Sequence, residues 1–522
     1  MRDFQSPGRS AVYVDNGMCA TSHPLAAQEA VRILQAGGNA VDAAIAGAVL
    51  LGVCEPHMTG IGGDCFALIA PEGAPVVAIN GSGRAHAAAD PERLRAAGHK
   101  VMPQDAPDAV TIPGAVDAFC TMSENWGRLG LTDSLAPAIR YFDDGVPVAP
   151  RVADDWAGMT GVLQGAARRH FLQDGAAPGV GTRFALPGQA EVLRRVAKDG
   201  RAAFYDGEVA EDMLATLAPA GHTAEDFAAA RTDTGAPISG GYAGATLSEH
   251  PPNGQGATAL LMLNILAQFD IASMDPFGAE RAHIEAEAAK LAYDARNRFM
   301  ADPDHTARLD HMLAPETAKR LAALIDPARA LPSPASASEA VHRDTVYITV
   351  VDRDRLAVSL IYSIFHGFGS GLASERFGIL FQNRGAGFSL EAGHPNEFGP
   401  GKRPMHTIIP GLLDLPDGAR MPFGVMGGQY QSAGHARLVT NLRDHGIDLQ
   451  GALDAPRSFP EDGTLMVERG YPDAVRAALA DKGHKVAIPD RAIGGAQAIR
   501  IRADGVLEGA SDPRKDGCAI GY

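Results

Sequence analysis

A threonine and a serine at the open end of a predicted hairpin are the side chains best placed for nucleophilic chemistry. Val346–Val351 is a β-branched and aromatic run typical of a buried strand, and Leu356–Tyr362 is a second apolar run after a polar turn. A hairpin centred on Asp354 places Thr345 opposite Ser363, with their Cβ atoms roughly 4.5–5.5 Å apart. The serine hydroxyl can then orient a nucleophilic threonine. The alternative is an ordinary pair of polar residues at the start of a strand.

Composition and charge exclude several classes of protein. The chain has 522 residues, 46% of them apolar, which predicts a globular fold with a large core. A formal charge of −16 argues against a nucleic-acid partner, because phosphates require a basic surface. The polar N-terminus resembles no signal peptide, and no apolar run reaches about 20 residues, so we expect a cytoplasmic protein that does not enter a membrane.

Neither a cofactor nor a metal is expected from the sequence patterns. The five cysteines are scattered without a CxxC pair, and the seventeen histidines show no spacing typical of metal ligands. The glycine-rich stretches Gly60–Gly63 and Gly367–Gly371 lack the features of phosphate-binding loops. Neither a G-x-S-x-G elbow nor an H-E-x-x-H pair occurs.

The pattern along the chain mixes helices with strands, which indicates layered packing of both. Helices are predicted at 24–35, 40–51, 279–299 and 431–444, and strands at 12–14, 18–21, 65–69, 378–381, 407–410 and 423–426. The segment 331–338, rich in Pro, Ser and Ala, has the composition of a mobile linker. It ends shortly before Thr345, which would make sense if the chain is cut there.

Several long motifs occur in a characteristic order. They are Ala20–Ala27, Gly37–Ala44, Glu55–Gly63 and the C-terminal stretch Gly509–Arg514. Over almost its full length the chain thereby resembles the γ-glutamyltransferase family of N-terminal-nucleophile hydrolases.

The resemblance implies an α+β fold, a four-layer αββα sandwich, made as a precursor that cuts itself before a threonine. Aligned on Val350–Asp352, that threonine is Thr345, and the cut falls between Asp344 and Thr345. Residues 1–344 would form a large subunit ending in the flexible linker, and residues 345–522 a small subunit. Both would remain associated within one intertwined domain.

The resemblance also implies a mechanism. Cleavage would free the α-amine of Thr345, whose pKa near ~8 suits it to accept the proton of its own hydroxyl. The hydroxyl would attack an amide and form an acyl-enzyme that water or an amine resolves. The family's oxyanion donors, the backbone N–H groups of a glycine pair, match Gly427 and Gly428, which could otherwise form only a tight turn. Ser363 matches the family's hydroxyl beside the nucleophile.

The match to the family weakens where the family binds the glutamyl head group. Ser82 stands at the position of an Arg, Phe365 at that of an Asn, and Gly387 at that of an acidic residue that grips the α-amino group. An ammonium group without a carboxylate partner loses a charge-assisted hydrogen bond. We therefore expect a glutamyl head group to bind poorly.

Cations near these positions could instead bind a carboxylate, although each could also be a solvated surface charge. The substrate-binding candidates are Arg84 and Arg384, with Lys402 and Arg403 weaker ones, and His406 and Thr407, which fall where the family has paired hydroxyls. The segments around Phe365 and Arg384 resemble the oxamate amidohydrolase and dicarboxylic-acyl acylase branches of the family.

These observations predict a self-processing amidohydrolase or acyltransferase for a short amide with a carboxylated acyl group, oxamate-like or glutaryl-like. One alternative is a genuine γ-glutamyltransferase or glutathione hydrolase with a rearranged pocket. Another is a non-catalytic scaffold, which would leave the chain uncut. The partners expected are the small-molecule amide and possible further copies of the chain.

Overall fold

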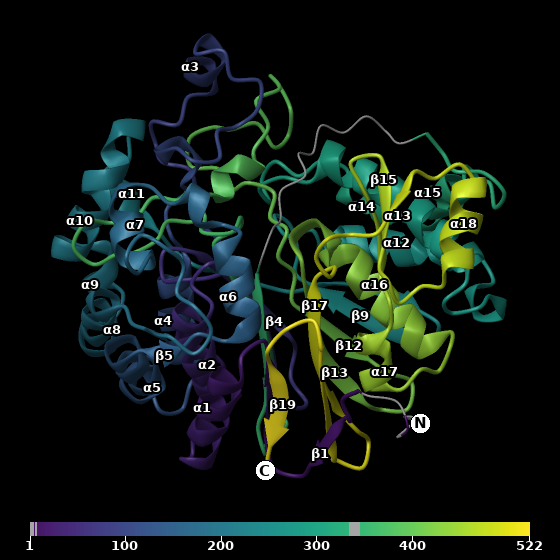
Figure 1. Cartoon of the computed structure of the whole chain (residues 1–522), viewed down its shortest axis with the longest axis horizontal. Helices are drawn as coiled ribbons and strands as arrows, with labels where there is room; N and C mark the ends of the chain where they lie inside the picture. The colour runs from purple at the N-terminus through teal and green to yellow at the C-terminus, as the bar shows by residue number, and fades with distance from the viewer. Residues whose placement is uncertain (1–4, 6–7, 333–344) are drawn as a thin grey trace.

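Two seven-stranded antiparallel sheets lie face to face at the centre of the computed structural model, which describes residues 5, 8–332 and 345–522 (Figure 1). Sheet I has the order β19 (Cys518–Gly521), β2 (Met18–Thr21), β10 (Val346–Val351), β11 (Ala357–Ser363), β3 (Asp64–Ala70), β4 (Val77–Gly81) and β7 (Asp233–Gly235). Sheet II has the order β1 (Val12–Val14), β18 (Leu507–Ser511), β17 (Gly495–Ile501), β13 (Arg420–Met426), β12 (Gly411–Asp414), β9 (Ala245–Glu249) and β8 (Ile238–Tyr242).

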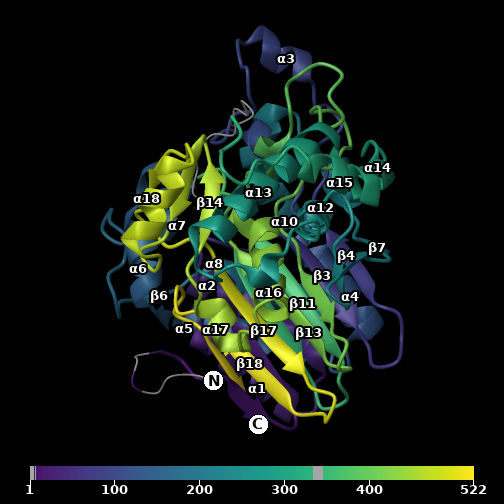
Figure 2. The same cartoon turned by 90° about the vertical axis from the view of Figure 1, so that its right-hand side faces the viewer.

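Helices cover the outer face of each sheet, which gives the four-layer αββα sandwich of an α+β fold (Figures 1 and 2). On the side of sheet I lie α1 (Pro24–Gln35), α2 (Ala40–Cys54), α4 (Ala115–Trp126), α5 (Leu131–Asp144), α6 (Pro150–Ala157), α7 (Gly165–Phe171), α8 (Pro187–Asp199), α9 (Ala202–Tyr205), α10 (Gly207–Leu217) and α11 (Ala224–Ala229). On the side of sheet II lie α12 (Gly256–Leu266), α13 (Ala279–Phe299), α14 (Leu309–Leu313), α15 (Pro315–Ala322), α16 (Gln431–Arg443), α17 (Leu449–Asp454) and α18 (Asp473–Asp481).

Smaller elements complete the chain. The short helix α3 (Pro91–Ala96) stands apart from the layers (Figure 1). Two small sheets lie outside the two main ones. One is the antiparallel pair of β5 (Val146–Pro147) and β6 (Arg183–Phe184), and the other has three strands, β14 (Ser458–Glu461), β15 (Thr464–Val467) and β16 (Val486–Ala487).

Helix α2 is buried in the structure, as its apolar sequence predicts. Asn39 caps its N-terminus, accepting hydrogen bonds from the backbone of Val41 and Asp42, and every residue of the helix is buried. A helix that is apolar all round must lie inside the protein. Gly47 leaves room for the side chain of Ile348, so α2 supports the strand that begins just after Thr345.

Each main sheet contains strands from both sides of residue 345. In sheet I, β10 lies between β2 and β11, and β11 pairs with β3. In sheet II, β12 pairs with β9, and β18 pairs with β1. Neither the part before residue 345 nor the part after it could therefore form its sheets alone.

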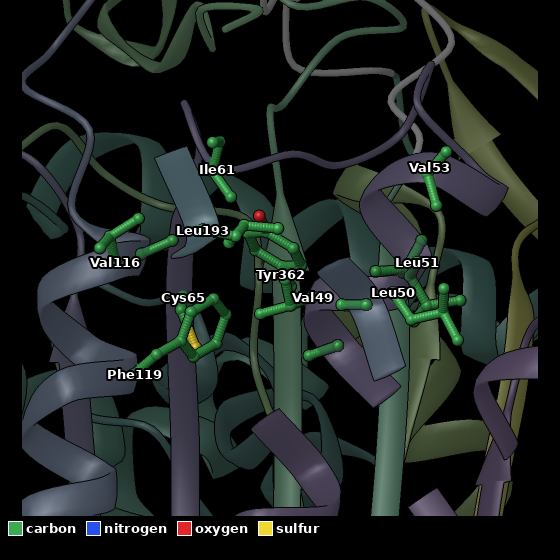
Figure 3. Close-up of a cluster of buried hydrophobic side chains, with 14 of the residues drawn as sticks. Val49, Leu50, Leu51, Val53, Ile61, Cys65, Val116, Phe119, Leu193 and Tyr362 are labelled. Atoms are coloured by element: carbon green, nitrogen blue, oxygen red, sulfur yellow. The ribbon is translucent and has the colours of Figure 1, made fainter. Parts of the chain in front are cut away.

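The hairpin of β10 and β11 has the predicted register. Val346 pairs with Tyr362 and Val351 with Ala357, which continues to Thr345 opposite Ser363. Successive side chains of a strand point to opposite faces. Tyr362 accordingly packs among α2 and α4, against the ring of Phe119 at 5.3 Å between centroids (Figure 3), and Ser363 faces the space between the sheets.

Two strand predictions are wrong. Residues 378–381 make a single bridge, Ala373 with Leu380, and residues 407–410 form no strand. Both segments are buried, so their apolar residues reflect burial without a hydrogen-bonded ladder. Asp344 and nearly all of the predicted linker lie outside the described residues. Among the described helices, none combines the length and the apolar character that a bilayer crossing requires.

Candidate active site

Thr345, directly before β10, and Ser363, the last residue of β11, lie side by side on the face of sheet I that is turned toward sheet II. Their hydroxyl oxygens are 3.3 Å apart, and both side chains are buried. The Ser363 oxygen also accepts hydrogen bonds from the Phe365 backbone N–H at 2.9 Å and from Arg384 Nη2 at 3.2 Å. With both lone pairs occupied, the serine proton points to Thr345. Ser363 therefore donates to Thr345 Oγ1 and fixes its orientation.

Arg384 is a fully buried cation whose two terminal nitrogens face hydroxyl groups. Nη2 donates to Ser363, and Nη1 donates to Thr407 Oγ1 at 3.1 Å. Its guanidinium carbon lies 4.1 Å from the centroid of the Phe365 ring. Phe365 itself has a φ of +78°, which is unusual for a residue with a side chain. The backbone turn at Phe365 thus brings an aromatic face over the guanidinium.

Asp64 supplies the counter-charge of Arg384. It is paired with Ser363 in the β3–β11 register, and its Oδ2 lies 3.8 Å from Arg384 Nε and 3.2 Å from His406 Nε2. Its Oδ1 accepts a hydrogen bond from the backbone of Gly83 at 2.9 Å. Burial raises the pKa of Asp64 to about 6, although Arg384 opposes that rise. Asp64 is thus a carboxylate at neutral pH that can take up a proton in mildly acidic solution.

His406 is a neutral hydrogen-bond donor in this arrangement. Burial, together with the nearby Arg384 charge, lowers the pKa of His406 well below its ordinary value. Its Nδ1 accepts from the backbone of Ile408 at 3.5 Å, so the proton is on Nε2 and points to Asp64. His406 therefore helps to hold the Asp64 carboxylate in place.

Gly427 and Gly428 follow β13 and come close to this group. Both have positive φ, +113° and +54°. The Gln255 side-chain amide donates to the carbonyl of Gly428 at 3.1 Å and to that of Thr407 at 2.6 Å. It therefore links the glycine pair to Thr407, the residue whose hydroxyl contacts Arg384. Within the described chain, neither glycine N–H donates to another residue. Two uncommitted N–H groups are what an oxyanion site requires.

An open cavity of about 300 Å³ adjoins both parts of the site. Phe365 and Gly387 line it on the side of Ser363, and Gln429 lines it beside the glycine pair. Arg296, which also lines the cavity, donates to the side chains of Gln255 and Gln429. The cavity thus lies beside residues that are close in sequence to Arg384 and Gly428.

Arg84 has a different environment from Arg384. It lies 3.3 Å from both Asp233 and Asp302 and donates to the Gly401 carbonyl, with 43% of its side chain exposed. The weaker candidates are also engaged elsewhere: Arg403 binds Asp233, and Lys402 donates to the Pro395 carbonyl. The structure thus joins Thr345, Ser363, Arg384 and Thr407 by direct contacts and His406 through Asp64. Gly427 and Gly428 are linked to Thr407 through Gln255, whereas the Arg84 side chain is directed to another group.

Sequence reasoning missed Asp64, Gln255 and Arg296. Asp64 had one signal, because it is the only charged residue in the apolar stretch 58–70 and directly precedes the predicted strand 65–69. Gln255 and Arg296 join segments more than 130 residues apart, which no local pattern reveals.

The chain is similar to several known proteins over almost its full length. The family model described as gamma-glutamyltranspeptidase matches residues 26–522. The chain is 36% identical to the glutathione hydrolase-like YwrD proenzyme of Bacillus subtilis, covering 97% of this chain and 98% of that protein. It is 37% identical, over the same shares of the two chains, to the oxamate amidohydrolase proenzyme of Klebsiella pneumoniae. The crystal structure of cephalosporin acylase from Bacillus halodurans superposes with a TM-score of 0.92 at 38% identity, covering 100% of this chain and 99% of that chain.

Proposed function

Because the chain belongs to the gamma-glutamyltranspeptidase family and is an amidohydrolase of the N-terminal-nucleophile class, we propose that it cleaves itself between Asp344 and Thr345 and then uses Thr345 as its nucleophile. The parts 1–344 and 345–522 remain together, since both contribute hydrogen-bonded strands to each of the two sheets. The relatives' description as proenzymes supports this processing.

In the proposed reaction, the free α-amine of Thr345 takes the proton of the threonine hydroxyl as Oγ1 attacks the carbonyl carbon of an amide. Ser363 donates to Oγ1 and keeps it aligned. The oxyanion that forms accepts hydrogen bonds from the backbone of Gly427 and Gly428. The α-ammonium then gives its proton to the departing amine, and water attacks the acyl-enzyme by the same steps to release the acid.

We propose further that the acyl part of the substrate carries a carboxylate held by Arg384 and Thr407. The observation that carries this proposal is the buried Arg384, whose Nη2 and the nucleophile Oγ1 both lie within 3.3 Å of the same Ser363 oxygen. A carboxylate one bond away from the scissile carbonyl, as in oxamate, suits so short a separation better than the longer glutaryl chain. The oxamate amidohydrolase of Klebsiella pneumoniae, at 37% identity, supports the same substrate class.

Asp64 and His406 act here as positioning residues. Asp64 balances the charge of Arg384 from the side away from the hydroxyls, and His406 orients Asp64. Arg84 receives no part in substrate binding, because Asp233 and Asp302 already neutralise it.

Steady-state kinetics with matched amides test the proposal. Oxamate and its neutral isostere oxamide differ only in the carboxylate, and glutaryl and γ-glutamyl anilides extend the acyl chain without and with an α-amine. We expect kcat/KM for oxamate to exceed that for oxamide by at least about tenfold, as for a charge-assisted contact. Efficient turnover of the γ-glutamyl anilide with poor turnover of oxamate would contradict the substrate assignment and favour a γ-glutamyltransferase.

A further inference from the structure

A buried cluster of metal-ligand residue types lies in the helical layer over sheet II. His283 and Glu287 are one turn apart on α13 and share a face, and His484 follows α18, which packs against α13. One nitrogen from each histidine and one oxygen of Glu287 all lie within 4.8 Å of one another. All three residues are buried.

His283 is oriented as a ligand would be. Its Nε2 is 2.8 Å from the Asp326 carbonyl, which can only accept, so Nε2 carries the proton. The lone pair is therefore on Nδ1, which accepts a hydrogen bond from His484 Nε2 at 2.7 Å. A metal ion at this place would take the position of that proton, with the His484 proton moving to its Nδ1. Histidines that bind metals commonly donate their remote N–H to a backbone carbonyl in this way.

Both carboxylate oxygens of Glu287 accept hydrogen bonds. Lys290 donates to Oε1 at 2.7 Å, and the backbone N–H of Leu331 donates to Oε2 at 2.8 Å. Oε1 also lies 3.8 Å from His484 Nε2. The carboxylate is thus fixed beside the two imidazoles, leaving lone pairs for another partner.

A cavity of about 550 Å³ adjoins the cluster, lined by His484, Lys290 and Leu331. Solvent can therefore reach one side of it.

We propose that His283, Glu287 and His484 bind a divalent transition-metal ion such as Zn²⁺, with a water or hydroxide from the adjoining cavity as the fourth ligand. Zn²⁺ takes such N/O sets at roughly 2.0–2.2 Å in tetrahedral geometry, which separates the two ligating nitrogens by about 3.3 Å. The imidazoles need to move apart by only about half an ångström from their present 2.7 Å.

The ion would be structural. It would link α13 to the segment after α18, and through Glu287 it would brace the backbone at Leu331. It takes no part in the reaction at Thr345, so the metal site and the proposed function stand or fall separately.

Metal binding to the purified full-length protein tests the proposal. After treatment with a chelator, the protein is titrated with Zn²⁺ in a calorimeter and with Co²⁺ under visible absorbance. We expect one ion per chain and the absorption bands of tetrahedral Co²⁺. Zn²⁺ should raise the Tm of the wild type, because a ligand that binds only the folded state stabilises it.

Matched variants separate this site from adventitious binding. His484→Gln and Glu287→Gln should each weaken Zn²⁺ binding at least about tenfold and remove the rise in Tm. Glu287→Gln keeps an oxygen for the Leu331 N–H and decides the matter if His484→Gln does not fold. His311→Gln, at an exposed position on α14, should bind as the wild type does, as should Thr345→Ala. The absence of saturable 1:1 binding, or equal affinity in all variants, would overturn the proposal.

Discussion

Arg84 and Arg384 carry the same charge and had the same expected role, yet their surroundings are opposite. Arg384 is fully buried, and among the described residues its terminal nitrogens donate to two hydroxyl groups while its Nε lies 3.8 Å from Asp64. Arg84 is 43% exposed and lies between two carboxylates. The two hydroxyl contacts of Arg384 can be exchanged for an incoming carboxylate at little cost, whereas two carboxylates already neutralise Arg84. The partners of an arginine, more than its position near a site, decide whether it can receive an anion.

The largest effect should follow from Arg384→Met. Removing one partner of a desolvated charge contact typically costs about 2–5 kcal/mol. We therefore expect kcat/KM for oxamate to fall by about 100-fold or more, with a much smaller fall for oxamide. Steady-state kinetics on both amides measures the difference, and the Tm checks that the variant is folded. Equal losses of kcat/KM on the two substrates would show that Arg384 does not bind the carboxylate.

Gly427→Ala tests the other half of the site. A Cβ there would lie 2.8 Å from Gly494 Cα at a φ of +113°, so the paired N–H groups must shift. Losing one oxyanion donor typically costs about 10²–10³ in rate. We expect kcat to fall by about 100-fold, equally for oxamate and oxamide, in contrast to Arg384→Met.

The control for this variant is Gly418→Ala, in the turn between β12 and β13. Gly418 has a φ of +83°, so alanine is strained there too, but the residue touches no part of the site. Its Tm should fall while its kcat stays near that of the wild type. A normal kcat in Gly427→Ala would argue against the oxyanion role.

The pH dependence of anion binding should follow the protonation of Asp64. Because the pKa of Asp64 is raised to about 6, its proton is bound below that pH and lost above it. Protonated Asp64 leaves the Arg384 charge uncompensated, while His406 stays neutral. The Ki of oxalate as an inhibitor should therefore increase several-fold as the pH rises through about 6.

Asp64→Asn should abolish that step, since an amide does not titrate. The raised pKa also has a consequence for stability: the protonated form favours the folded state, so the Asp64 contribution is greatest below about pH 4 and is lost as the pH rises through about 6. A step in Ki that persists unchanged in Asp64→Asn would assign the titration to another group.

The smallest effect should come from Arg84→Met. Ion pairs of partly exposed side chains contribute about 0–1 kcal/mol. We expect kcat/KM for oxamate to stay within about threefold of the wild type. A loss comparable to that of Arg384→Met would restore Arg84 as a substrate-binding residue and remove the contrast between the two arginines.

The sequence predicted the parts of the site that local periodicity determines. The strand pattern and the polar turn fixed the β10–β11 register, and so the contact between Thr345 and Ser363. Asp64 and its hold on Arg384 depend on the pairing of β3 with β11, which joins residues some 300 positions apart. The segments 378–381 and 407–410 looked like strands because burial selects the same apolar residues that strands use.

The cluster of His283, Glu287 and His484 also could not be predicted from local sequence patterns. His283 and Glu287 have helical spacing, but their third member lies 201 residues after His283. Only the packing of α18 on α13 brings His484 to them.

The central claim is that Thr345 becomes the N-terminus and the acyl-accepting residue. Intact mass and N-terminal sequencing of the purified protein, before and after brief incubation with a slowly hydrolysed oxamate-type ester, test it most directly. We predict two fragments, with the smaller one beginning at Thr345 and carrying the acyl mass, and a chain that stays whole in Thr345→Ala. A folded wild-type chain that remains uncut, or an acyl group found on any other residue, would contradict the account.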